Sequence, residues 1–404
     1  MRVNLSHQTH SIDKIYECGK SLKKEVTELS QILENQSFNK HESFVLLPFD
    51  ENHIIKLLEF KKKFPAKNLK RIIVLGIGGS IQGAKAIYEL LKNEKTLIHT
   101  EWIDQIDSEK INKNISELKN LNPDEYLVFI ITKSGSTTET LFNFELFESN
   151  FKLDSNRLVF ITEETSHLVS ICESKNYNYL TFPKKISGRF SVFTMVGLAP
   201  LAIAGVNIIK LLEGGMLAVN SINNFEENYS LQSAVAKFLA KRIINENLYP
   251  TRHFGELGKW EKQLFNESLG KTSNAMFSSF GNFYLELHSS LQLYLNSKNV
   301  FLNIVSYKNL EPLSVKETDL LSKNFYHTES EEINKAILTS VVRELDKNLI
   351  PTITIELKSL DEVEIGNYMQ NKMQECYFLC KLNDVNPFDQ PDVNSYKENL
   401  IRYI

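Results

Sequence analysis

The pattern of apolar and polar positions changes near residue 65. Before that point, Leu, Ile, Val and Phe recur among Lys and Glu at helical spacing, which predicts a peripheral helical region punctuated by KKKFPAK at 61–67. After it, short continuous apolar runs alternate with helix-compatible stretches. The runs predicted as strands are 71–77, 99–106, 126–132, 157–163 and 177–183. Apolar strands separated by helices predict a parallel sheet covered on both faces.

A second block of the same kind follows residues 213–230, which begin with paired glycines and become polar, so they form a candidate domain junction. Its clearest predicted strands are 251–257, 299–307 and 352–357. The tail from residue 384 begins irregular and ends helix-compatible. Two similar α/β units are the economical interpretation, since the chain has no short repeat or low-complexity segment.

Composition narrows the class of protein. The 404 residues are enough for two or three domains, and 46 Lys and Arg against 50 Asp and Glu are mixed along the chain. This balance argues against a broad nucleic-acid or membrane surface. The N-terminus has no apolar core followed by a small-residue cleavage site, so we expect a cytoplasmic protein. The apolar stretch at 193–206 is too short to span a bilayer, and we expect a buried helix there.

The four cysteines are too few for a disulfide framework in a chain of this length. Cys376 and Cys380 lie four positions apart, one turn along a predicted helix. A metal site there would need His or Cys ligands from elsewhere, so buried packing is the favoured interpretation.

The first strand leads into GIGGSIQGAKAIYELL at 76–91. Glycines at a strand-to-helix turn let the backbone approach an anion, and the helix N-terminus adds free N–H groups. A dinucleotide fingerprint would need glycine or alanine where Ile81 stands, and a P-loop would need lysine where Ala84 stands. Both nucleotide interpretations are therefore weak, and a plain tight turn is the alternative.

A second loop of this kind, ITKSGSTTET at 131–140, carries six hydroxyls directly after the predicted strand 126–132. Hydroxyls donate hydrogen bonds without adding charge, which suits a small phosphate better than a bulk polyanion. A solvated Ser/Thr turn would also fit the composition. Because open parallel sheets bind ligands at the carboxyl ends of their strands, two anion-suited loops in one sheet favour a phosphorylated metabolite.

Four single residues are chemically suggestive. Gln263 and Glu267 share a helix face that Gly270 would end, and a partly desolvated Glu267 could act as a base. His288 stands among apolar residues at helical spacing, and Arg189 follows a glycine. In isolation, each fits an ordinary surface or structural role. No one of them names a reaction.

Taken together and in this order, the segments resemble the glucose-6-phosphate isomerase family, also called phosphoglucose isomerase. The matching segments are GIGGS at 76–80, TKSGSTTET at 132–140, SGRFSVFTMVG at 187–197, QLFNESLGK at 263–271 and FDQPDVNSYK at 388–397. Three positions depart from the family's usual pattern: Ser187 replaces a glycine, Asp392 a glycine and Asn394 a glutamate. The spacing from Gln390 to Lys397 is intact, so the resemblance retains the lysine role.

The resemblance implies an α/β fold of two flavodoxin-like sugar-isomerase domains, each a mostly parallel sheet between helices. The implied bounds are an N-terminal helical region at 1–60, domains at 61–212 and 213–383, and a C-terminal tail at 384–404 with the active-site lysine. The resemblance also implies a homodimer in which His288 reaches the neighbouring subunit's site. It implies no metal and no organic cofactor.

The resemblance further implies a role for each matched residue in interconverting glucose 6-phosphate and fructose 6-phosphate. His288 and Lys397 would open the sugar ring, Glu267 would carry a proton between C2 and C1 through a cis-enediol, and Arg189 would stabilise the developing negative charge. The expected substrate contacts are Gly79, Ser80, Thr132, Lys133, Ser134, Thr137, Gly188, Gln263 and Gln390, with Glu139 in support.

Three alternatives remain open at this point. An isomerase that also accepts mannose 6-phosphate would share every motif. A regulatory module that binds a sugar phosphate would keep the loops without the chemistry, although Glu267, His288, Arg189 and Lys397 together argue against it. A nicotinamide-dependent dehydrogenase has the wrong glycine spacing.

Overall fold

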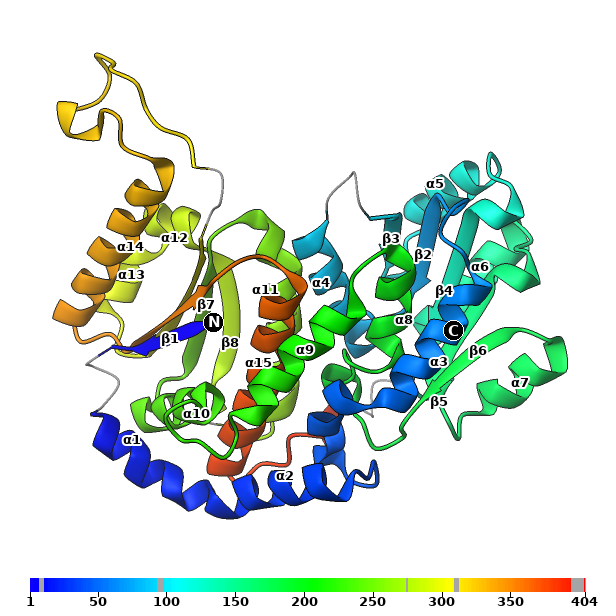
Figure 1. The fold of residues 1–404 in the computed structure, drawn as a ribbon, viewed down its shortest axis with the longest axis horizontal. Helices are drawn as coiled ribbons and strands as arrows, with labels where there is room; N and C mark the ends of the chain where they lie inside the picture. Colours follow the sequence, from blue (N-terminus) through cyan, green and yellow to red (C-terminus); the bar gives the residue numbers. More distant parts are fainter. Residues whose placement is uncertain (7–10, 93–96, 274, 309–311, 394–402, 404) are drawn as a thin grey trace.

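The predicted strands of the first block form one five-stranded sheet (Figure 1). The computed structural model describes residues 1–6, 11–92, 97–273, 275–308, 312–393 and 403. The sheet order is β3-β2-β4-β5-β6, every neighbouring pair is parallel, and the order counted within this unit is the 2-1-3-4-5 of flavodoxin-like folds. The strands are β2 (Arg71–Leu75), β3 (His99–Ile103), β4 (Tyr126–Ile131), β5 (Leu158–Glu163) and β6 (Asn178–Phe182).

Alternate side chains of the central strands enter different cores. Ile72 and Val74 of β2 belong to the main hydrophobic cluster, and Ile73 and Leu75 to a second one. Both faces are covered, which is why these strands are continuously apolar in sequence. The helices of this unit are α3 (Glu51–Lys63), α4 (Gln82–Leu91), α5 (Ser108–Leu118), α6 (Thr138–Asn150), α7 (His167–Lys175) and α8 (Met195–Ala204). Every residue of α8 is buried, which confirms the helix expected there.

The second sheet has the order β1-β10-β9-β7-β8. Its four later strands are parallel and repeat the flavodoxin-like order, while β1 pairs antiparallel with β10 at the edge. The strands are β1 (Arg2–Leu5), β7 (Ile244–Tyr249), β8 (Phe277–Asn282), β9 (Val300–Tyr307) and β10 (Thr352–Leu357). The N-terminal region is therefore helical as predicted except for its first strand, which completes a sheet built mainly from the far end of the chain.

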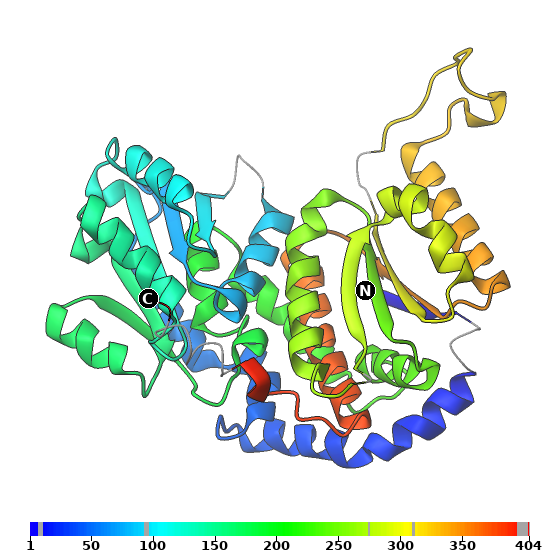
Figure 2. The same cartoon turned by 180° about the vertical axis from the view of Figure 1, so that it is seen from behind.

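Helices cover both faces of the second sheet. The helices α10 (Tyr229–Ala240), α11 (Gly255–Leu269) and α15 (Glu362–Leu382) lie on one face, and α12 (Phe283–Ser289), α13 (Leu291–Asn296) and α14 (Ser330–Lys347) on the other (Figure 1). Two N-terminal helices, α1 (Ile12–Gly19) and α2 (Lys23–Asn35), run along one edge of the molecule (Figure 2). None of the helices in the described ranges is both long enough and apolar enough to cross a membrane.

One sequence interpretation in the second unit needs correction. Residues 251–257, predicted as a strand, form a 3-10 helix (η7, Arg252–Phe254) and the start of α11. The strand that precedes this segment is β7. It was not predicted because its sequence, INENLY, is largely polar. The paired glycines Gly214 and Gly215, which begin the candidate junction at 213–230, lie inside α9 (Ile208–Asn220). A Cβ on Gly214 would stand 2.0 Å from the carbonyl oxygen of Val363, so glycine here permits close packing of α9 on α15.

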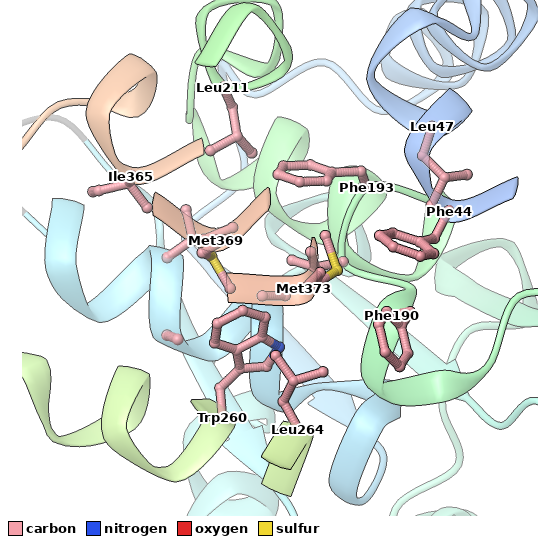
Figure 3. Packing of buried hydrophobic residues seen from close by; sticks show 14 of the residues in the cluster. Phe44, Leu47, Phe190, Phe193, Leu211, Trp260, Leu264, Ile365, Met369 and Met373 are labelled. Carbon is pink, nitrogen blue, oxygen red and sulfur yellow. The ribbon is translucent and has the colours of Figure 1, made fainter. Parts of the chain in front are cut away.

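The main hydrophobic cluster joins the two units. Trp260 and Leu264 of α11 face Met369 and Met373 of α15, and Phe190 and Phe193 extend the same cluster toward the first sheet (Figure 3). This continuous core fixes α11 against the segment around Phe190. The remaining short helices are η1 (Lys20–Leu22), η2 (His41–Phe49), η3 (Gly78–Ser80), η4 (Pro123–Glu125), η5 (Ser155–Arg157), η6 (Gly188–Phe190), η8 (Lys323–Phe325) and η9 (Pro391–Val393).

Candidate active site

Arg189 is the centre of the candidate site. Its residue is 3% exposed, and η6 directs its guanidinium toward the C-terminal turn of α11. There Nη1 donates to Glu267 Oε1 at 2.5 Å and Nε donates to Ser268 Oγ at 2.8 Å. A buried arginine must have its donors satisfied, and these contacts bind it rigidly to the carboxylate that the sequence singled out.

Glu267 is held from two sides. Its second oxygen, Oε2, accepts a hydrogen bond of 2.9 Å from Gln263 Nε2, one helical turn earlier on α11. The helix ends at Leu269 with Gly270 as its C-cap, as the sequence predicted. The Glu267 side chain keeps 21% of its surface exposed, so the carboxylate is oriented by two donors while one side stays open to a ligand.

The glycine loop after β2 packs directly on η6. A Cβ on Gly79 would stand 2.4 Å from the carbonyl carbon of Gly188 and 2.6 Å from the amide nitrogen of Arg189. Gly78 has a φ of +56°, and a Cβ there would stand 2.9 Å from Gln263 Nε2. These close approaches require glycine, and they bring the loop carrying Ser80 to the Arg189–Glu267 pair.

The hydroxyl-rich loop lies at the neighbouring strand end. Since β2 and β4 are adjacent and parallel, the loops that follow them meet at the carboxyl edge of the sheet. Thr132 Oγ1 and Thr137 Oγ1 are 2.8 Å apart, and Ser134 Oγ and Ser136 Oγ are 2.9 Å apart. Thr137 is the N-cap residue of α6, but its side chain makes no capping hydrogen bond. Only one of the two hydroxyls can donate in the Thr132–Thr137 pair, so the other keeps its proton for a second acceptor at this helix N-terminus.

Charge at this loop is positive. Burial lowers the pKa of Lys133, and the nearby Arg189, Lys184 and Lys185 lower it further, while Glu163 opposes them. Several cations close together stabilise an anion between them, which supports a phosphate at this edge. Glu139 lies half-buried in the first turn of α6.

The start of the C-terminal tail is bound to the same arginine. Arg189 Nη2 donates to the carbonyl oxygens of Pro387 at 2.6 Å and Asp389 at 2.9 Å. Lys271 Nζ lies 2.7 Å from Asp389 Oδ1. Gln390 follows immediately and is exposed. The structure thus brings the beginning of the tail motif to Arg189, while Lys397 and Asn394 lie outside the described residues.

His288 is not part of this constellation within one chain. It is an exposed residue of α12, on the far side of the second sheet from α11. Among the described residues, no hydrogen bond or ion pair joins it to Arg189, Gln263 or Glu267. Its role in the site stays a prediction that depends on a second copy of the chain.

Comparisons with known proteins identify the family. A family model described as phosphoglucose isomerase matches residues 59–251. A glucose-6-phosphate isomerase from Mycoplasmopsis pulmonis (strain UAB CTIP) is 31% identical over 416 residues, covering 95% of this chain and 96% of the relative. The chain belongs to the glucose-6-phosphate isomerase family.

Solved structures support the fold. A hypothetical protein from Thermus thermophilus superposes with a TM-score of 0.85 at 24% identity, covering 100% of this chain and 99% of that one. A glucose-6-phosphate isomerase from Chlamydia trachomatis D/UW-3/Cx gives a TM-score of 0.73 at 20% identity, over 87% of this chain and 73% of that one. Together with the two sheet orders, these similarities confirm the predicted fold class.

Ser187, which departs from the family pattern, lies in a buried turn. Ser187 is 6% exposed, and its hydroxyl is buried with no hydrogen-bond partner among the described residues. The backbone there has a φ of −75°, which any residue adopts, so the extra side chain leaves the η6 turn unstrained. Asp392 lies in η9 and is exposed.

Sequence reasoning missed two residues that support the site. Ser268 is fully buried and accepts the Arg189 Nε hydrogen bond, and Lys271 holds Asp389. Both belong to the segment QLFNESLGK, but their roles depend on partners about 80 and 120 positions away, which spacing along one helix does not show. In the described part of the chain, no group of three or more His, Cys, Asp or Glu side chains is arranged to hold a metal ion.

Proposed function

We propose that this protein interconverts glucose 6-phosphate and fructose 6-phosphate with Glu267 as the proton-transferring base. The assignment of Glu267 as the base depends on how its carboxylate is held. Its two oxygens accept hydrogen bonds from Arg189 at 2.5 Å and from Gln263 at 2.9 Å, beside the two loops of the first sheet. Family membership identifies the reaction as aldose–ketose isomerisation. The geometry of this chain supports a specific division of labour among its residues.

The 6-phosphate binds at the carboxyl edge of the first sheet. Hydroxyls of Ser80, Thr132, Ser134 and Thr137, with backbone N–H groups near Gly79 and at the start of α6, supply donors without net charge. Lys133 and its cationic neighbours add the field that favours a dianion. Binding this remote group positions C1 and C2 near Glu267, and positioning of this kind raises the rate.

Proton transfer takes place at Glu267. It removes the proton from C2 and returns it to C1, so that the carbon skeleton passes through a cis-enediol. Arg189 stays protonated throughout and stabilises negative charge on the enediolate oxygens. Its contacts to Ser268, Pro387 and Asp389 hold the guanidinium in place before the substrate arrives. Gln263 and Gln390 contact sugar hydroxyls or a water, and Glu139 orients a cationic partner.

The first experiment measures conversion of fructose 6-phosphate by the purified chain in chelator-treated buffer, coupled to glucose-6-phosphate dehydrogenase. Glu267→Gln should lower turnover by at least ~10²-fold while folding and phosphate affinity are kept, which is the lower scale for general acid–base catalysis. Glu213→Gln, an exposed glutamate of α9, is the matched control. Near-normal turnover of Glu267→Gln would show that Glu267 is not the base. Saturable binding of fructose 6-phosphate without turnover by the unaltered chain favours a regulatory module.

Ring opening requires His288 of a second chain and Lys397 in this proposal. His288 lies away from Glu267 within the chain, so the proposal includes a homodimer with sites at its interface. Mixing His288→Ala and Glu267→Gln chains tests it. Random pairing gives half heterodimers with one intact site each, so about a quarter of the unaltered activity should return. No recovery after verified subunit exchange would place His288 outside the neighbouring site. A cytoplasmic location belongs to the same proposal.

A further inference from the structure

A cavity of about 630 Å³ lies at the carboxyl end of the second sheet, away from Arg189 and Glu267. Its floor is the face of β1, β10 and β9 that α14 leaves uncovered. Asn4, Thr354 and Ile304 form one cross-strand row of this floor, and Ser306 and Glu356 form the next. The volume is in the range of pockets that hold small organic ligands.

The cavity lies at the place in the second sheet that corresponds, by topology, to the proposed phosphate site at the carboxyl edge of the first sheet. In that sheet the loops after the adjacent strands β2 and β4 carry the candidate substrate contacts. In the second sheet the adjacent strands are β7 and β9, whose connections run to opposite faces through α11 and α14 (Figure 1). The loop residues Pro250 and Thr251 after β7, and Lys308 after β9, line the cavity. Open α/β sheets bind ligands in the crevice between such strand ends.

The walls of the cavity include a continuous apolar surface. Phe283 of α12 and Leu338 and Val342 of α14 supply it. Walls of this kind favour a ligand with an apolar body.

Charge at the rim favours an anion. Lys308, Lys335 and Arg343 line the cavity with Glu331 and Glu356, so three cations stand against two carboxylates. All three basic residues are exposed, and none of the five forms an ion pair with another described residue. The five side chains together carry a net charge of +1, which favours an anion over a cation.

We propose that this cavity is a second ligand site, which binds a small organic anion with an apolar body. The body lies against Phe283, Leu338 and Val342, and the anionic group faces the basic residues at the rim. The site goes beyond isomerisation and does not depend on it, because none of its residues takes part in the proposed reaction.

The probe is 8-anilinonaphthalene-1-sulfonate, an aromatic sulfonate whose fluorescence rises on binding, titrated in low-salt buffer. The unaltered protein should show one saturable site per chain. Leu338→Asp should weaken it by at least ~10-fold, and Lys335→Glu by at least ~5-fold. Lys347→Glu makes the same charge change on α14 outside the cavity and should leave the affinity within about 2-fold.

Three results would overturn the proposal. The first is the absence of saturable binding by the folded, unaltered protein. The second is an affinity that Leu338→Asp and Lys335→Glu leave unchanged, which places the dye on another surface. The third is loss of dye binding in saturating fructose 6-phosphate, which places it in the substrate site. Lys335 is exposed, so Lys335→Glu remains informative if Leu338→Asp does not fold. Isomerase turnover serves as the folding check.

Discussion

Arg189 and Glu267 are 78 positions apart in the chain, yet Arg189 Nη1 lies 2.5 Å from Glu267 Oε1. The same guanidinium also reaches Ser268 and two carbonyl oxygens of the tail. One side chain therefore joins the η6 turn, the end of α11 and the start of the tail into a single unit.

Arg189→Lys should damage both activity and stability. A lysine keeps the charge, but it lacks the planar fork that reaches four acceptors, so buried carbonyl groups such as that of Pro387 lose their donor. Each such loss costs about 1–3 kcal/mol, and turnover should fall ~10²-fold. Urea unfolding and the coupled assay measure the two effects. Arg252→Lys, at an exposed arginine, is the control, and unchanged turnover in Arg189→Lys would contradict the assigned role.

Gly79→Ala should displace η6. Its Cβ would stand 2.4 Å from the Gly188 carbonyl carbon, and this backbone cannot move without moving Arg189. We expect kcat/KM to fall by at least ~10²-fold, because misplacement by about an ångström has that effect on a positioned site. Gly255→Ala is the matched control, since a Cβ there meets nothing within 4 Å. Equal activities of the two variants would show that the loop contact is not needed.

Ser187→Ala should stabilise the protein. The Ser187 hydroxyl is buried without a partner among the described residues, so removing it should add about 1 kcal/mol to the free energy of unfolding. Ser191→Ala is the opposite case, because Ser191 Oγ donates to the Gly188 carbonyl oxygen at 2.7 Å. It should cost about 1 kcal/mol. Urea unfolding measures the free energy of unfolding of both variants. Destabilisation by Ser187→Ala would reveal a partner for the Ser187 hydroxyl.

Glu246→Gln should stabilise the protein only at higher pH. Burial raises the pKa of Glu246, and the nearby Glu286 raises it further. The folded state therefore holds this proton more tightly than the unfolded state, so stability is lost as pH rises from the unfolded pKa through the folded pKa. Glutamine avoids that loss. The variant should exceed the unaltered protein in stability at about pH 8, with little difference at about pH 4.

Thermal or urea unfolding at the two pH values measures this difference. Glu59→Gln, at an exposed glutamate of α3, corrects for the change in net charge. A stability difference for Glu246→Gln that stays constant between the two pH values would rule out a raised pKa at Glu246.

Most of the first unit could be predicted because its strands are buried on both faces. All six residues of β4 are buried, and a strand of this kind is recognisable in the sequence as an apolar run. The strand β7 could not be predicted, because Asn245 and Asn247 are buried as part of a polar ladder. Asn303 Nδ2 donates to Asn245 Oδ1 at 2.8 Å, so burial there depends on a partner 58 positions away.

In the candidate site, too, contacts within one helix could be predicted and contacts between distant segments could not. The pairing of Gln263 with Glu267 follows from helical spacing and is confirmed. The contacts of Arg189 with the carbonyl groups of Pro387 and Asp389 could not be predicted, since a carbonyl group is present at every position and leaves no signature in the sequence. The joining of His288 and Lys397 to the site stays a prediction.

The edge strand β1 has a consequence for synthesis of the chain. Residues 2–5 are synthesised long before their partner β10 at 352–357. The first sheet, contained within residues 71–182, can fold while translation continues. The second sheet cannot close until β10 is made, so β1 must wait unpaired. A translating ribosome stalled before residue 352 should therefore carry a folded first unit and an open second one.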